Sequence, residues 1–148
     1  MEFASPAWSP WLEGDKKKLE AVQERAIKMI SGLKGKTYEE KCRELGLETL
    51  EERRDRQDMA EVHRMMQEEE KESRRGVLQV IGTRGGTTTR RAADSTSLQK
   101  QYARTDTRKY SFGLRVKERW NSMDSGIREE TDGKVFKRRL KLERKRNQ

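Results

Sequence analysis

The residues of this chain best suited to chemistry are its lysines and arginines, which gather in its second half. Residues 1–72 contain 14 Lys/Arg and 18 Asp/Glu, a net charge of −4, whereas residues 73–148 contain 21 and 8, a net charge of +13. A concentrated positive charge favours a polyanionic partner, most often nucleic acid, which is bound through its phosphates with release of counterions. We therefore expect the chain to bind an RNA or DNA backbone in a salt-sensitive, sequence-indifferent way.

The predicted contacts with nucleic acid form two groups. One group lies between residues 84 and 119, among aromatic side chains that offer planes for base stacking, and the other lies near the C-terminus. The predicted contacts are Arg84, Arg90, Arg91, Arg108, Lys109, Arg115, Lys137, Arg138 and Arg139. Arg104, Lys117 and Arg119 extend the first group, whose aromatic residues are Tyr102, Tyr110, Phe112 and Trp120. For Phe112 and Trp120 helical spacing favours the core over base stacking. The clusters at 137–139 and 144–146 also fit a nuclear-import sequence.

Other residues with reactive side chains lack the spacing of a catalytic or metal site. Asp55, Asp58 and Glu61 are interleaved with arginines, which favours a solvated helix face with local ion pairs over metal binding. His63 is predicted to be an exposed helical residue, and Cys42 a small, half-buried one. One cysteine and one histidine exclude an internal disulfide and a zinc site of four Cys/His ligands. We expect no catalytic residue, no metal and no cofactor.

A glycine-rich stretch, Gly82 to Arg91, invites comparison with a phosphate-binding loop. It lacks the Gly-Lys-Ser/Thr ending and a following helix, so a flexible linker is favoured.

The elements that must position these residues are predicted to be mainly α-helical. A first helix is expected over residues 15–33, with Asp15 as its N-cap. Its apolar row is Leu19, Val22, Ala26, Met29, Ile30 and Leu33. Thr37 with Glu40 predicts a capping box for a short helix that stops at Gly46. Thr49 with Glu52 predicts a second capping box before a helix over residues 50–71. The expected buried row of this helix is Leu50, Met59, Val62 and Met66. Short links between the three predict a small three-helix bundle.

Composition divides the chain into three expected segments. These are a helical module (1–72), a largely disordered Thr/Gly/Arg-rich linker (73–107) and a short basic C-terminal helical segment (108–148). Residues 77–81 have strand-like composition without a clear neighbour, and the periodicity of 109–120 fits helix and strand alike. A last helix is expected over 134–146, with Val135, Phe136 and Leu140 inward. At 30% hydrophobic and 41% charged residues, we expect partial folding.

Two features concern location and context. The sequence has no apolar run near the about 18 residues of a membrane span and no secretory leader, so we expect an intracellular protein without membrane contact, in nucleus or cytoplasm. Phe3, Trp8 and Trp11 near the start favour a partner surface that removes them from water. This opening is typical of the middle of a longer protein.

Several separated phrases, in order, resemble the C-terminal region of reverse transcriptases from LINE-type non-LTR retrotransposons. The first half contributes Glu2-Phe3-Ala4-Ser5-Pro6-Ala7-Trp8, Leu19-Glu20-Ala21-Val22-Gln23-Glu24-Arg25-Ala26, Tyr38-Glu39-Glu40, Leu45-Gly46-Leu47 and Leu50-Glu51-Glu52-Arg53-Arg54. The second contributes Thr83-Arg84-Gly85, Arg108-Lys109-Tyr110-Ser111-Phe112, Trp120-Asn121-Ser122 and Phe136-Lys137-Arg138-Arg139-Leu140. The chain departs from the family pattern at Glu24, Gly86, Lys117 and Asp124, where a basic residue, a histidine, an apolar residue and a proline are usual.

The resemblance implies that residues 3–72 correspond to the helical thumb behind a polymerase palm. The Tyr-x-Asp-Asp hairpin that binds Mg²⁺ in such polymerases is absent from this sequence, so a non-catalytic fragment is expected. Its expected partners are an RNA or DNA backbone and, in addition, a palm domain or a second copy. Two alternatives remain open: a helical module that docks on a protein through the apolar row of residues 19–33, and a translated relic with no selected role.

Overall fold

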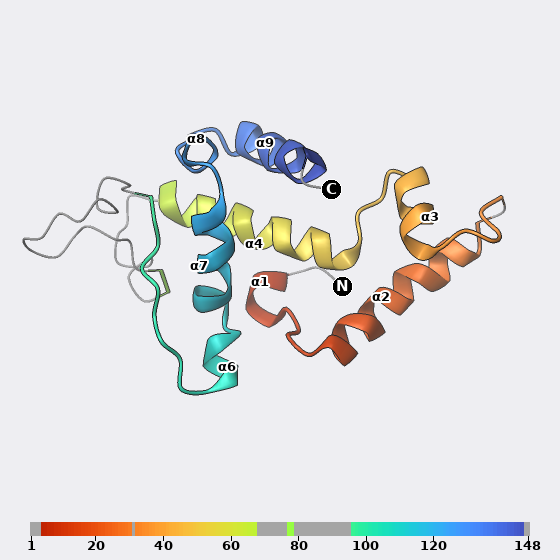
Figure 1. Cartoon of the computed structure of the whole chain (residues 1–148), viewed down its shortest axis with the longest axis horizontal. Helices are drawn as coiled ribbons and strands as arrows, with labels where there is room; N and C mark the ends of the chain where they lie inside the picture. Colours follow the sequence, from red (N-terminus) through yellow and green to blue (C-terminus); the bar gives the residue numbers. More distant parts are fainter. Residues whose placement is uncertain (1–3, 31, 68–76, 79–95, 147–148) are drawn as a thin grey trace, which may run out of the picture. The chain divides into compact units, whose positions relative to one another are not determined.

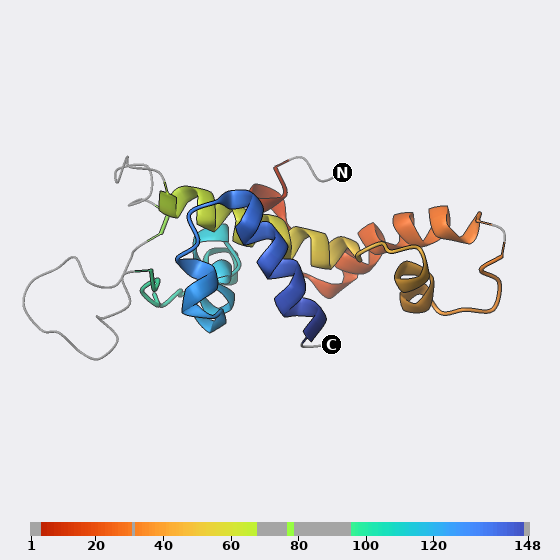
Figure 2. The same ribbon diagram turned by 90° about the horizontal axis from the view of Figure 1, so that it is seen from above.

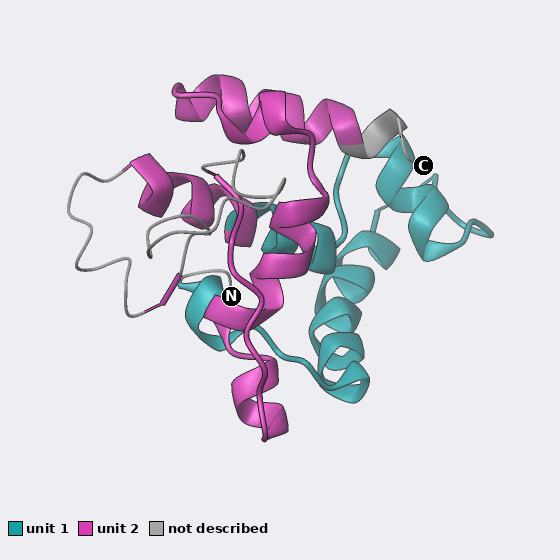
Figure 3. Ribbon diagram, turned by 60° about the vertical axis from the view of Figure 1, so that its left-hand side comes forward, with its two compact units in different colours: residues 1–57 teal, residues 58–148 magenta. Residues whose placement is uncertain are grey.

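The computed structural model describes residues 4–30, 32–67, 77–78 and 96–146, with the backbone alone for 144–146. These residues form eight helices, which confirms the mainly α fold (Figure 1). In order they are α1 (Ser5–Trp8), α2 (Glu13–Lys28), α3 (Tyr38–Glu44), α4 (Leu50–Gln67), α6 (Asp106–Lys109), α7 (Phe112–Ser122), α8 (Ser125–Arg128) and α9 (Gly133–Arg146). The chain divides into two compact units, residues 1–57 and 58–148, and α4 runs through the boundary (Figure 3).

In unit 1, sequence signals at the helix ends act as predicted. Thr37 and Glu40 form a capping box at the start of α3. The hydrogen bonds between Thr49 and Glu52 form a second at the start of α4. Gly46 has a φ of 64°, a left-handed conformation that ends α3 and that glycine adopts without strain.

The prediction for the buried face of α2 is wrong in part. The helix begins at Glu13 after Leu12, so Asp15 is not its N-cap, and it ends at Lys28. Leu33 is buried as expected, but the side chains of Val22 and Met29 are 49% and 82% exposed. The buried apolar residue is Ile27, which packs with Leu33 and Cys42. The inward face is therefore displaced by about one residue from the predicted row.

A polar network explains this displacement. The amide of Gln23 donates hydrogen bonds to the phenol oxygen of Tyr38 and to the carbonyl of Glu48, both at 3.0 Å. The carboxylate of Glu20 accepts one bond from the Tyr38 hydroxyl and another, at 3.0 Å, from the backbone N–H of Leu50. Burial and the bond to Glu20 raise the pKa of the Tyr38 phenol. Polar residues of α2 thus hold α3 and the start of α4, which turns the Val22 face outward.

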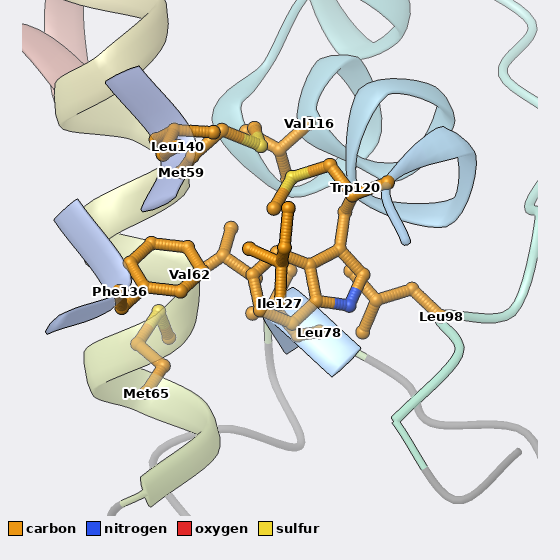
Figure 4. Close-up of a cluster of buried hydrophobic side chains, with 11 residues drawn as sticks. Met59, Val62, Met65, Leu78, Leu98, Val116, Trp120, Ile127, Phe136 and Leu140 are labelled. Carbon is orange, nitrogen blue, oxygen red and sulfur yellow. The ribbon is translucent and has the colours of Figure 1, made fainter. Parts of the chain in front are cut away.

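Unit 2 has the larger apolar core, which Figure 4 shows. Its buried residues are Met59, Val62, Met65, Leu78, Leu98, Val116, Trp120, Met123, Ile127, Phe136 and Leu140. Met59, Val62, Phe136 and Leu140 were expected inside. The buried methionine at the end of α4 is Met65, while the predicted Met66 is only partly buried. In Figures 1 and 2, α7 and α9 lie against the C-terminal part of α4.

Helix α7 resolves the ambiguous periodicity of residues 109–120 in favour of helix. Phe112, Val116 and Trp120 share one face at steps of four, and Val116 and Trp120 are buried. A Cβ atom at Gly113 would lie 2.5 Å from the carbonyl oxygen of Val77, so only glycine allows this close approach. Residues 79–81 of the strand-like run, and most of the predicted linker, lie outside the described residues. The divisions at 72 and 107 stay predictions.

Candidate nucleic-acid interface

Helix α9 carries the most concentrated positive charge in the described structure. Its sequence contains eight lysines and arginines and one glutamate, Glu143. Phe136 and Leu140 are buried against the core, and Glu143 is buried too. The exposed residues Lys134, Lys137, Arg138 and Lys141 follow at i, i+3, i+4 and i+7, the spacing of one helix face. The helix therefore anchors itself by one side and presents a row of cations on another.

Arg139 stands apart from that row although the sequence groups it with Lys137 and Arg138. One nitrogen of its guanidinium donates a hydrogen bond to the carbonyl of Gly126 at 3.1 Å, and another lies 3.3 Å from the carboxylate of Glu130. These contacts tie α9 to the α8 region. A substitution at Arg139 would consequently remove contacts within unit 2 as well as surface charge.

On α7, the guanidinium of Arg115 is engaged inside unit 2. Its Nε and Nη2 each donate a hydrogen bond of 2.9 Å to the carboxylate of Asp58, and the two side chains are 18% and 9% exposed. Nη1 donates to the carbonyl of Tyr110 at 3.3 Å. The predicted solvated face is therefore wrong for Asp58, whose partner comes from 57 residues further along the chain. Because its charge is paired with Asp58 in the fold, Arg115 is a weaker candidate for phosphate contact than the exposed Lys137 and Arg138.

Lys117 is the other basic residue of α7 that the structure takes from solvent. It is 3% exposed, and its Nζ has no hydrogen-bond partner among the described residues. Burial lowers the pKa of this ammonium group, and the positive charge of Arg108 lowers it further. A buried lysine without an acceptor is unfavourable to the fold. Lys117 is thus a source of strain in the core rather than a phosphate contact.

Trp120 lies in the core and Phe112 packs partly against it, as their helical spacing favoured. Trp120 is 0% exposed and its indole Nε1 donates a hydrogen bond of 2.8 Å to the carbonyl of Thr96. Phe112 is partly buried against the same core. Next to Trp120, the amide of Asn121 exchanges two hydrogen bonds, of 2.9 and 2.8 Å, with the backbone of Leu98. The Trp-Asn pair fastens residues 96–98 to α7, a role that its sequence did not reveal.

Of the remaining predicted contacts, some are exposed in the structure and others lie outside the described residues. Arg108 and Lys109 are exposed on the single turn of α6, and the ammonium of Lys109 lies 5.3 Å from the centre of the Tyr110 ring. Arg104 is exposed just before this turn. Arg84, Arg90 and Arg91 lie outside the described residues, so their contact with nucleic acid stays a prediction.

His63 is buried, and the prediction of an exposed residue is wrong. Its ring stacks on Phe136 with 4.1 Å between the centroids, and Nε2 lies 2.6 Å from the carbonyl oxygen of Glu130. Phe136 and Glu130 are far away in sequence, so local pattern could not find them. Cys42 is a buried free thiol. Within the residues that the structure describes, no three His, Cys, Asp or Glu side chains are grouped as metal ligands would be.

Comparisons with known proteins add no relative: the chain matches no protein-family model, no curated protein and no solved structure. In the described part of the chain, no helix has the length and apolar character that crossing a membrane requires.

Proposed function

We propose that this chain is a non-catalytic nucleic-acid-binding segment of the LINE-type reverse-transcriptase kind, and that α9 is its principal contact with RNA or DNA backbones. The observation that carries the proposal is the row of exposed cations on α9. A helix anchored by Phe136 and Leu140 holds these charges at fixed spacing, which suits phosphate contact and needs no base recognition.

The distribution of charge between the two units supports this assignment. Unit 1 contains twelve Lys/Arg and twelve Asp/Glu, whereas unit 2 contains 23 and 14, so the whole net charge of +9 belongs to unit 2. Position 117, where the family pattern favours an apolar residue, is buried. Lys117 is thus a charged residue at a buried position where the family pattern has an apolar one.

The test is binding to a labelled RNA–DNA hybrid over a series of salt concentrations. In the variant K134A/K137A/R138A we expect weaker binding and a salt slope smaller by about 2 to 3, about one unit for each lost phosphate contact. Arg139 is left intact because it bonds Gly126 and Glu130. Far-UV circular dichroism confirms that the variant stays folded. An unchanged affinity and slope would overturn the proposal.

A second candidate, a helical protein-interaction module, rests on the exposed apolar residues of unit 1. Leu12 and Val22 are each 49% exposed, and Met29 is 82% exposed. Light scattering separates the two functions. A monomer that binds the hybrid supports nucleic-acid binding, whereas a dimer that is indifferent to the hybrid supports the interaction module, with a second copy as its partner.

A further inference from the structure

The segment of residues 99–104 connects the buried Leu98 to α6 and is largely exposed. At one end Leu98 is fully buried and bonded through its backbone to Asn121, and at the other the chain enters α6. Figure 1 draws the stretch between as an extended trace. All of its side chains are exposed except that of Ala103, which is half-buried. The fold thus presents a short piece of chain to solvent at a fixed place.

Tyr102 is the exception among the aromatic residues of unit 2. Its side chain is 88% exposed, whereas Trp120 and Phe136 are fully buried and Phe112 and Tyr110 are half-buried. The ring of Trp120 is therefore inaccessible to a base, and those of Phe112 and Tyr110 are partly covered. Of the described aromatic residues in this unit, Tyr102 alone offers its ring freely to a base.

The residues two positions before and after Tyr102 are basic and can contact the phosphates that flank such a base. Lys100 and Tyr102 are alternate residues of the extended stretch, so they are placed on one face. Arg104 follows two residues after the ring, where the chain bends towards α6, so a cation precedes and follows Tyr102 in the chain. Both cations are exposed, and the recorded ion pair of Lys100 is a 4.0 Å approach to Glu118, itself 89% exposed. Such a pair is worth little in water and yields readily to a phosphate.

We propose that Lys100, Tyr102 and Arg104 form a stacking site for single-stranded RNA or DNA, in which one unpaired base lies on the Tyr102 ring and its flanking phosphates meet the two cations. A duplex keeps its bases stacked on one another and leaves none for Tyr102, so the site selects single strands. This inference rests on the proposed function and refines it: α9 contacts any backbone, and the Tyr102 segment adds affinity for unpaired bases.

The experiment compares two labelled probes on the full-length chain: an unstructured single-stranded RNA and an RNA–DNA hybrid of equal length. We expect Tyr102→Ala to weaken single-strand binding about fivefold or more, as loss of one stacked base does, and to leave hybrid binding within twofold. Tyr102→Phe keeps the ring and should bind the single strand like the native chain. Gln101→Ala, at an exposed neighbour, is the matched control and should change neither affinity.

Each other outcome overturns the site in a recognisable way. Equal affinities of Tyr102→Ala and the native chain for the single strand refute stacking while hybrid binding, and with it the function of α9, still stands. Equal losses on both probes show that Tyr102 does not discriminate unpaired bases. If the native chain binds neither probe, the site and the proposed function fall together.

Discussion

Helices α2 and α9 have similar amphipathic patterns, but the predicted apolar face is buried in α9 and largely exposed in α2. In α9 the predicted apolar residues Phe136 and Leu140 are buried, and the cations face outward. In α2 the predicted row is largely exposed, and the inward face is formed by Glu20, Gln23 and Ile27. The difference teaches that a periodic pattern locates a helix, whereas the side that is buried depends on what its neighbours offer.

The neighbours differ because the two units are stabilised differently. In the described part of unit 2, eleven buried residues form one apolar core, which accepts an apolar helix face. In the described part of unit 1, the buried cluster consists of Ile27, Leu33 and Cys42, and Leu50 is buried as well. Unit 1 relies in addition on the hydrogen bonds of Glu20, Gln23 and Tyr38. Substitutions in unit 2 should therefore act chiefly through packing, and substitutions on the outer face of α2 should have little effect.

The largest effect is expected at Trp120. Replacement by alanine removes a fully buried ring and its hydrogen bond to Thr96, and should lower the free energy of unfolding by about 3–5 kcal/mol. Urea denaturation followed by circular dichroism measures this. Trp120→Phe, which keeps most of the volume, should lose much less. A cost below about 1 kcal/mol for the alanine variant would contradict a packed core in unit 2.

Breaking the ion pair between Asp58 and Arg115 should come next. Asp58→Ala leaves a mostly buried guanidinium without its carboxylate, and we expect a loss of about 3 kcal/mol in the same denaturation experiment. Asp58→Asn, which keeps the shape but not the charge, should also be destabilising. A loss of only about 0.5 kcal/mol, the value of an exposed pair, would show that this contact is solvated after all.

Replacing Lys117 by methionine should raise stability at pH 7, by about 1 kcal/mol, because it removes a buried ammonium group without an acceptor. The pKa of Lys117 is lowered in the folded state, so the unfolded chain binds the proton more tightly. Its penalty is therefore present at neutral pH and fades as the pH rises towards the ordinary lysine value of 10.5. Unfolding at pH 7 and pH 10 should show the advantage of the variant shrinking; an advantage equal at both would refute this account.

The smallest effect is expected at Met29, the exposed residue that directly follows α2. Met29→Gln should change stability by less than about 0.5 kcal/mol, as exposed substitutions usually do. Its matched partner is Ile27→Ala, two residues away but 3% exposed, which should cost about 2 kcal/mol or more. Similar costs for both would mean that the Met29 side of α2 is covered, as the interaction-module hypothesis requires.

Sequence patterns predict those features of the structure that depend on neighbouring residues. The capping boxes at Thr37 and Thr49 and the inward face of α9 depend on residues within a few positions, and all three were predicted. His63 and Asp58 were placed wrongly because Phe136, Glu130 and Arg115 reach them from distant parts of the chain. No local pattern encodes such partners.

The sequence predicts an excess of positive charge in the candidate interface, but it does not show which of the basic side chains are exposed. Sequence grouped Arg139 and Arg115 with Lys137 and Arg138, and only the fold shows that the first two are engaged by carboxylates. Conversely, Lys134 belongs to the exposed row of α9 although it stands outside the basic cluster. Helical spacing from the predicted inward residues could have found it.

The central claim is that binding depends on where the positive charge lies and not only on how much there is. Two charge-reversal variants test it most directly: K137E/R138E on α9, and K17E/K18E on the exposed part of α2, which change the net charge by the same amount. Titration of the labelled RNA–DNA hybrid at physiological salt should show a loss of about tenfold or more for the α9 variant, and a much smaller loss for the α2 variant. Equal losses, or none in either, would contradict the claim.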